Sequence, residues 1–278
     1  MTVRQALALA GAAFCASGIE EASLESELLL RYVLKTDRVQ LFLRLDEELS
    51  PAHEEAYKKL IARRQKGEPA AYITHNREFY GRDFYVDSRV LIPRPETELL
   101  VAIALEHAGK HAVQTIADIG TGCGNIAICL AIHLPQTQIY ATDISAEALE
   151  VARLNIARHK INNVQLRQGS FLEPLPEPVN IIVSNMPYVR HPELHLVNTV
   201  GFEPVLALDG GENGLEVISR LCRQVKNKLK PDSILLLEIG AGQKEVIVNL
   251  LQELFPSAKI EVTADPGGIE RVVGLFLQ

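Results

Sequence analysis

Asp118-Ile119-Gly120-Thr121-Gly122-Cys123-Gly124 joins an apolar run at 115–119 to an apolar helical segment at 125–134. Glycines at the end of a buried strand let the backbone approach a ligand closely, and the following helix presents free N–H groups. The alternative is a glycine turn that only packs the helix against the strand. Asp143 ends the next predicted strand, where a carboxylate can accept both hydroxyls of a ribose. The loop and this acid together predict a nucleoside cofactor.

Strands and helices alternate from about residue 95 onward. Besides the two elements around the glycine loop, we predict strands at 138–142, 164–168, 180–183 and 233–239, helices at 146–159, 214–230 and 243–254, and two late strands flanking Pro266-Gly267-Gly268. Ser145 is expected to cap the helix that follows it. This alternation is typical of an α/β fold with a mainly parallel sheet and helices on both faces.

The first 70 residues instead show helix start and stop signals. Thr2 and Gln5 have capping-box spacing, Ser23 is a candidate cap for a second helix, and Ser50-Pro51 is typical of a helix start. Aromatic residues then flank a glycine-containing turn, as in a β-hairpin, and a proline-rich connector follows. We therefore predict a helical domain at 1–70, a β-hairpin linker at 71–94 and an α/β domain at 95–278.

Charge and composition exclude several classes of protein. The net charge of −7 provides no global positive field for nucleic acid. The four cysteines form no CxxC pair, so neither a disulfide framework nor a metal site is indicated, and a reducing compartment is expected. The sequence contains no run of about 18 apolar residues, so no membrane span is predicted. A signal peptide is conceivable at the Ala-rich start, but its apolar residues share one helical face and favour an amphipathic helix.

Ser184-Asn185-Met186-Pro187-Tyr188 is the second informative stretch, after the apolar run at 180–183. The Asn185 side-chain oxygen and the Met186 carbonyl can each accept one hydrogen of an –NH2 group. Pro187 restricts residue 186 to extended geometry, and the Tyr188 ring can cover the flat face of the bound group. The motif indicates group transfer onto a nitrogen, with the glycine loop holding the donor.

The G-x-G-x-G spacing of the loop resembles the first motif of class I S-adenosylmethionine (SAM) methyltransferases. The resemblance implies SAM as the cofactor, with Asp143 on the ribose and Phe171 beside the adenine; for Phe171, a core aromatic is the alternative. It also implies cofactor contacts from Asn185 and from the loop residues Gly120, Thr121, Gly122, Cys123 and Gly124.

Asn185-Met186-Pro187-Tyr188 resembles the N-P-P-Y motif of amino-directed methyltransferases, which methylate adenine N6 or glutamine amides. Stretches at 77–81, 92–98 and 201–204 are similar to the protein-(glutamine-N5) methyltransferases of peptide-chain release factors. The resemblance covers essentially the whole chain. It implies a Rossmann-like class I methyltransferase fold, a helical domain that docks the substrate, and methylation of the glutamine in the release factor's Gly-Gly-Gln loop.

Met186 departs from this family, which normally has proline there; the carbonyl is kept, but the locked φ is lost. Three functions therefore stay open: glutamine methylation of class-1 release factors, adenine-N6 methylation of nucleic acid, and a SAM-binding module without activity. The first implies a catalytic set of Asn185, Met186, Pro187 and Tyr188. It also implies a cytoplasmic monomer with no metal, no membrane and no direct nucleic-acid substrate.

Overall fold

The computed structural model describes residues 1–197 and 201–277. The chain divides into two compact units, Met1–Asn76 and Arg77–Gln278, each with its own apolar core. The division falls after Asn76 because the short helix α5 (Ala70–Thr74) belongs to the first unit and the hairpin belongs to the second. The functional roles of the predicted domains stay predictions.

The first unit contains α1 (Val3–Ala16), α2 (Ala22–Leu34), α3 (Arg38–Leu43), α4 (Pro51–Gln65) and α5. The predicted capping box of Thr2 and Gln5 is confirmed, and so is the cap at Ser50, whose hydroxyl accepts from the His53 N–H at 3.2 Å. The predicted cap at Ser23 is wrong. Helix α2 already begins at Ala22, so Ser23 lies inside its first turn and no side chain caps it.

The second unit begins with a β-hairpin and continues as alternating strands and helices. Its elements are β1 (Arg77–Phe79), β2 (Arg82–Phe84), η1 (Pro95–Thr97), α6 (Glu98–Lys110), β3 (Thr115–Ile119), α7 (Asn125–His133), β4 (Gln138–Asp143), α8 (Ala146–His159), β5 (Val164–Gln168), β6 (Val179–Ser184), η2 (His191–Leu196), η3 (Val205–Ala207), α9 (Glu216–Gln224), η4 (Val225–Asn227), β7 (Leu229–Glu238), α10 (Lys244–Leu254), β8 (Lys259–Ala264) and β9 (Glu270–Phe276). Ser145 caps α8, as predicted.

The seven larger strands form one sheet in the order β5-β4-β3-β6-β7-β9-β8. Pairing is parallel from β5 to β7, and β9 is antiparallel to both β7 and β8. The chain proceeds from β3 outward through β4 and β5, and then returns to β6 on the other side of β3. Ligands of such sheets bind where the strand order reverses, beyond the carboxyl ends of the strands.

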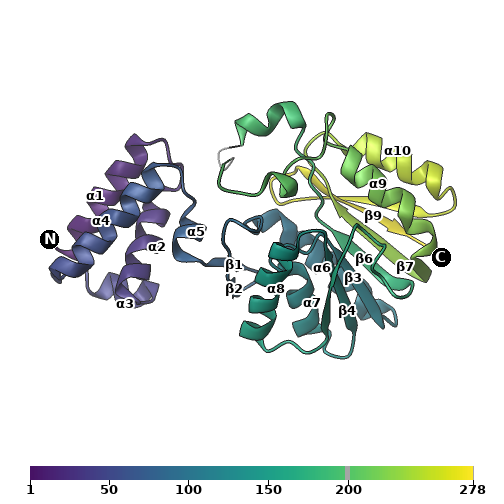
Figure 1. Ribbon diagram of the computed structural model, residues 1–278, viewed down its shortest axis with the longest axis horizontal. Helices are drawn as coiled ribbons and strands as arrows, with labels where there is room; N and C mark the ends of the chain where they lie inside the picture. The colour runs from purple at the N-terminus through teal and green to yellow at the C-terminus, as the bar shows by residue number, and fades with distance from the viewer. Residues whose placement is uncertain (198–200, 278) are drawn as a thin grey trace. The chain divides into compact units, whose positions relative to one another are not determined.

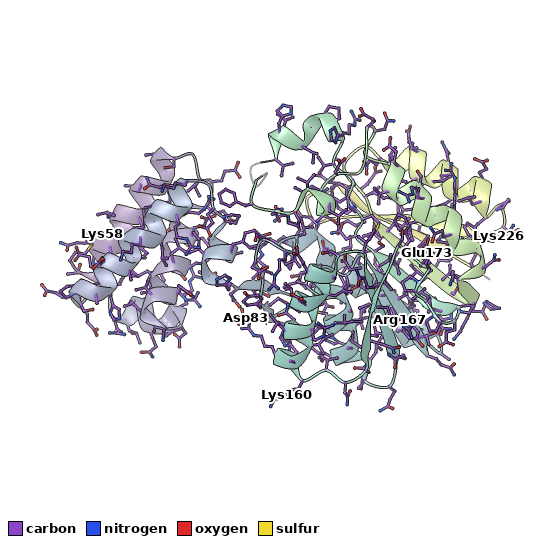
Figure 2. The ribbon with its side chains drawn as sticks, viewed as in Figure 1. Lys58, Asp83, Lys160, Arg167, Glu173 and Lys226 are labelled. Atoms are coloured by element: carbon purple, nitrogen blue, oxygen red, sulfur yellow. The ribbon has the colours of Figure 1, made fainter. Side chains whose placement is uncertain are left out.

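Two apolar layers cover the sheet, one on each face, as the predicted fold class requires. Alternate residues of a strand point to opposite faces: Ile116 joins the core beneath α6 and α7, whereas Ala117 joins the core beneath α9 and α10. Figure 1 shows α6, α7 and α8 on one side of the strands and α9 and α10 on the other. Charged side chains such as Lys160 and Lys226 lie at the periphery of this unit in Figure 2.

The predicted helix at 214–230 is too long. Helix α9 ends at Gln224, a single 3-10 turn follows, and β7 begins at Leu229. The Val179 N–H donates to the Lys228 carbonyl at 2.9 Å, so pairing with the start of β6 draws residues around 229 into the sheet. No described helix has the length and apolar character needed to cross a membrane.

Asn155, on α8, ties the segment after the hairpin to the glycine loop. The Tyr85 N–H donates to Asn155 Oδ1 at 2.7 Å, and Asn155 Nδ2 donates to the carbonyls of Tyr85 and Cys123, both at 2.9 Å. Asn155 is fully buried. Three hydrogen bonds from one buried amide therefore position the loop that the fold presents to a ligand.

Asn155→Asp is expected to destabilise the protein by at least about 2 kcal/mol. The carboxylate keeps the acceptor but loses both donors, so the hydrogen bonds to the Tyr85 and Cys123 carbonyls are lost and a charge is buried. Asn162→Asp makes the same change at an exposed position and should stay within about 0.5 kcal/mol of wild type. Urea unfolding followed by circular dichroism measures both; equal stabilities would contradict this role of Asn155.

Candidate active site

A cavity lies at the carboxyl ends of β3, β4 and β6, where the strand order reverses. Of the residues predicted for the site, those that line it are Gly120, Gly122, Asp143, Phe171, Asn185, Met186 and Pro187. The glycine loop and the acceptor motif, far apart in the sequence, therefore share one cavity. The described lining does not include the other four predicted residues: Thr121, Cys123 and Gly124 are buried, and Tyr188 is partly buried.

The glycine loop is fastened to β4. The N–H groups of Gly120 and Thr121 both donate to the Thr142 carbonyl at 2.9 Å. Gly122 has φ +55°, and a Cβ placed there would meet no atom within 4 Å, so open space lies against its backbone. Gly124, at φ +84°, packs its Cα side on Ala152 of α8. One glycine thus opens the loop to a ligand, and the other packs the loop against a helix.

Asp143 faces the cavity with both carboxylate oxygens oriented. The Gly122 N–H donates to Oδ2 and the Ser145 N–H donates to Oδ1, each at 2.9 Å. Burial raises the pKa of this carboxyl, and these backbone hydrogen bonds oppose the rise. Each oxygen keeps a further lone pair for a ligand hydroxyl. This arrangement fits the diol of a ribose.

Asp118 is a buried acid beneath the loop that sequence reasoning did not include among the site residues. The Thr121 hydroxyl donates to its Oδ2 at 2.6 Å and the Ala127 N–H donates to the same atom at 3.2 Å, whereas Oδ1 has no partner among the described atoms. Burial raises the pKa of Asp118 to about 7. An unpaired oxygen this deeply buried destabilises the folded state, which is typical of a functional site.

Phe171 lines the cavity in an uncommon backbone conformation. Its φ is +48°, a region that costs a side-chain-bearing residue about 1 kcal/mol or more, and the Thr142 hydroxyl donates to its carbonyl at 3.2 Å. The guanidinium carbon of Arg220 lies 5.2 Å from the ring centroid. Arg220 also lines the cavity, and no motif in the sequence points to it.

The acceptor motif is held by buried polar contacts on β6 and its neighbours. The Ser184 hydroxyl donates to the Ile119 carbonyl of β3 at 2.8 Å. Asn185 Nδ2 donates to the Thr97 hydroxyl at 3.0 Å, and the Tyr188 hydroxyl donates to Glu238 at 3.3 Å. Burial raises the pKa of Tyr188. Thr97 and Glu238 are site residues that sequence reasoning missed: Thr97 lies in the stretch 92–98 that resembles the family, but nothing local gives it a role, and Glu238 belongs to no recognisable motif.

Met186 connects the acceptor motif to the glycine loop. Its side chain is 6% exposed and belongs to the core beneath α9 and α10. A Cβ placed on Gly120 would lie 2.3 Å from the Met186 Cε, so the methionine side chain fills the space against that glycine. The residue that departs from the family pattern therefore packs directly on the loop.

Two further walls come from segments at 89–91 and 204–207. Glu203, whose side chain is fully buried, connects the two segments. The Ile92 N–H donates to its Oε1 at 2.8 Å, and Arg94 forms a salt bridge with its Oε2 at 2.6 Å. Arg94 therefore holds the cavity wall, whereas Glu98 accepts from the Tyr80 N–H at the hairpin. No described group of three or more His, Cys, Asp and Glu could hold a metal ion.

Asp118→Asn is expected to gain stability relative to wild type as pH rises from about 4 to about 7. An acid whose folded pKa is raised stabilises the fold below its unfolded pKa of 3.8, and this contribution is lost as pH rises through about 7. Across this range the difference in free energy of unfolding between the two proteins should change by about 4 kcal/mol, since each pKa unit corresponds to about 1.4 kcal/mol. Thermal unfolding of both ligand-free proteins across this range measures it; a pH-independent difference would contradict the buried ionisation.

Two families match the chain: the PrmC N-terminal domain over residues 5–74 and the methyltransferase small domain over residues 96–201. A release factor glutamine methyltransferase from Koribacter versatilis is 41% identical over 278 residues, and the match covers 98% of each chain. One from Moorella thermoacetica is 40% identical over 274 residues, covering 98% of this chain and 97% of the relative.

Solved structures show the same α/β fold. The T. thermophilus 16S rRNA N2 G1207 methyltransferase, in complex with AdoMet and guanosine, has a TM-score of 0.52 at 16% identity, covering 73% of this chain and 50% of that one. A methyltransferase from Pyrococcus furiosus has a TM-score of 0.50 at 19% identity, covering 71% and 89%. The predicted fold class is confirmed. With relatives this similar along nearly all of its length, the chain belongs to the release factor glutamine methyltransferase family.

Proposed function

We propose that this protein transfers a methyl group from SAM to the side-chain amide nitrogen of the glutamine in the Gly-Gly-Gln loop of class-1 peptide chain release factors. One observation carries the proposal: Asn185 and Met186 line the same cavity as Gly122 and Asp143. An acceptor amide held by the first pair thus lies next to a cofactor held by the second. The names of the full-length relatives support the same substrate.

The residues around the cavity fit SAM. Asp143 offers two oriented oxygens to the ribose, the open backbone at Gly122 leaves room beside it, and Phe171 provides an aromatic wall for the adenine. SAM, when bound, supplies an electrophilic methyl group on a sulfonium. The chain's own part is to hold the acceptor nitrogen in line with that group.

A primary amide is a poor nucleophile because its nitrogen lone pair is delocalised into the carbonyl. The Asn185 Oδ1 and the Met186 carbonyl each accept one of its two hydrogens, which orients the nitrogen and increases its electron density. Such positioning can contribute up to about 7–11 kcal/mol. Transfer would form the N–C bond as the sulfonium S–C bond breaks and leaves its electron pair on sulfur. The nitrogen would then be positive and would lose one proton to water, so we place deprotonation after methyl transfer.

The helical unit Met1–Asn76 is proposed to dock the release factor. Leu24, Leu28 and Tyr32 recur every four residues along α2 and are 36–46% exposed, which leaves an apolar stripe on one side of that helix. A stripe of this kind suits contact with another protein. Because release factors act in translation, we further propose that the enzyme works in the cytoplasm.

Asn185→Ala is expected to lower the turnover of release factor by about 100-fold, since the acceptor amide loses one of its two orienting oxygens. SAM affinity should fall much less than turnover, because the glycine loop and Asp143 keep their contacts and only the predicted contact from Asn185 is lost. The assay measures transfer from tritiated SAM to purified release factor, and exposed Asn162→Ala is the matched control. Unchanged turnover in Asn185→Ala would contradict the assigned role.

The same assay separates the three functions that the sequence leaves open. Label on wild-type release factor, and none on its Gln-to-Ala loop variant, supports glutamine methylation. Label on DNA or RNA would support adenine methylation instead. SAM binding with no label on any substrate would identify a docking module without activity.

Met186→Pro is expected to preserve or improve turnover and to lower stability by about 1–3 kcal/mol. Proline restores the stiff backbone of the family motif and keeps the carbonyl, but it removes the buried thioether that packs on Gly120. Steady-state kinetics and urea unfolding measure the two effects. A large loss of turnover in a folded variant would show that the loop is built differently here.

A further inference from the structure

Asn185 can serve as an acceptor in only one of the two orientations of its amide. With Oδ1 toward the cavity, it accepts a hydrogen from the substrate –NH2 group. Rotated by 180°, it would present its own –NH2 group, and donor would face donor. Because the two orientations have nearly the same shape, packing alone does not choose between them. Hydrogen bonds must make the choice.

Thr97 provides the hydrogen bond that selects one orientation of the Asn185 amide. Asn185 Nδ2 donates to the Thr97 hydroxyl at 3.0 Å. Thr97 is only 2% exposed and precedes α6 as its N-cap residue, yet its hydroxyl does not cap that helix. Thr97 has helical backbone angles, φ −66° and ψ −19°, which do not suit a capping side chain, so its hydroxyl is available to Asn185. A hydroxyl can both donate and accept, however, so Thr97 needs a partner that fixes its proton.

Glu238 is that partner. It ends β7, in the position after Leu237, which pairs with Ser184, so it lies beside Asn185 at the carboxyl end of the neighbouring strand. The Tyr188 hydroxyl donates to the Glu238 carboxyl at 3.3 Å, and the Thr97 hydroxyl lowers the pKa of the same carboxyl. An ionised carboxylate only accepts. A Thr97 hydroxyl that donates to this carboxylate keeps its own oxygen free to accept from Asn185 Nδ2.

The orientation of the Thr97 hydroxyl, and through it that of the Asn185 amide, depends on whether the Glu238 carboxyl is charged. Glu238 is 1% exposed, and its Oε2 has no partner among the described atoms. Burial raises its pKa to about 7 and the nearby Glu96 adds to the rise, whereas Thr97, Tyr188 and Arg271 oppose it. Above that value the carboxylate is ionised and can accept a hydrogen bond from each of the two hydroxyls.

We propose that Thr97 and Glu238 are positioning residues that hold the Asn185 amide with its Oδ1 toward the acceptor nitrogen. The inference rests on the proposed function, and it adds two residues that are not part of the described cavity lining. Glu238 fixes the hydroxyl proton of Thr97, Thr97 fixes the amide of Asn185, and Asn185 orients the substrate.

Thr97→Val is the direct test, because it removes the hydroxyl and nearly keeps the shape. We expect kcat for release factor to fall by about 10- to 100-fold, with the KM for SAM unchanged, and Thr97→Ser to restore kcat to within about threefold of wild type. In the Asn185→Ala background the same change should have almost no effect, because the residue being positioned is gone. Equal losses in both backgrounds would overturn the proposal.

Thr137→Val is the matched control. Thr137 is also buried, at 5% exposed, and its hydroxyl donates to the Val113 carbonyl at 3.0 Å, away from the cavity. Thr137→Val should lower the stability of the protein and leave kcat unchanged. Glu238→Gln should also lower kcat, because a glutamine amide can donate to Thr97 and free its hydroxyl to donate to Asn185 Oδ1. Wild-type kcat in Glu238→Gln would overturn the assignment of Glu238.

A second readout does not depend on turnover. In ¹⁵N-labelled protein, the side-chain –NH2 resonances of Asn185 should be separated in wild type and Thr97→Ser, and move toward those of exposed Asn162 in Thr97→Val. If Thr97→Val does not fold, Thr97→Ala replaces it in both experiments. Wild-type protein with no turnover would contradict the proposed function, whereas these resonances still decide the orientation of Asn185. Resonances unchanged by loss of the hydroxyl would overturn the inference.

Discussion

The parallel pairing of β3 with β6 is the interaction on which the site depends. Ile119 is paired with Ser184, and the Ser184 hydroxyl donates to the Ile119 carbonyl at the last position of both strands. The glycine loop and the acceptor motif begin immediately after this pair. Because parallel strands end at the same edge of a sheet, two motifs 65 positions apart meet across one cavity. A change of register would separate them.

Buried polar side chains then fix the loops at this edge. Asn155 holds the glycine loop, Glu203 clasps two walls of the cavity, and Glu238 lies beneath the acceptor motif. A buried polar group is costly unless it is hydrogen-bonded, so each of these groups strongly favours the one loop arrangement that pairs it. Unpaired oxygens remain on Asp118 and Glu238, and both are acids whose burial raises the pKa. Both acids lie next to loops that build the site.

The success of sequence reasoning varied with the type of signal. Strands β3 to β6 and the cap at Ser145 were predicted within one or two residues, because apolar runs and capping residues are local signals. The helix after residue 214 was overextended, since pairing with β6 converts its end into a strand. Ser23 was misplaced as a cap because helix boundaries depend on neighbouring turns as well as on the capping residue.

The sequence by itself determined the alternating α/β fold, the glycine loop with its strand-end acid, and an acceptor motif suited to an –NH2 group, since each depends on residues close together in the chain. Only the tertiary structure decided that Thr97, Arg220 and Glu238 belong with them. These three lie on η1, α9 and β7 and share no local pattern. Their roles come from packing at the edge of the sheet, where burial removes water and leaves protein atoms as the hydrogen-bond partners.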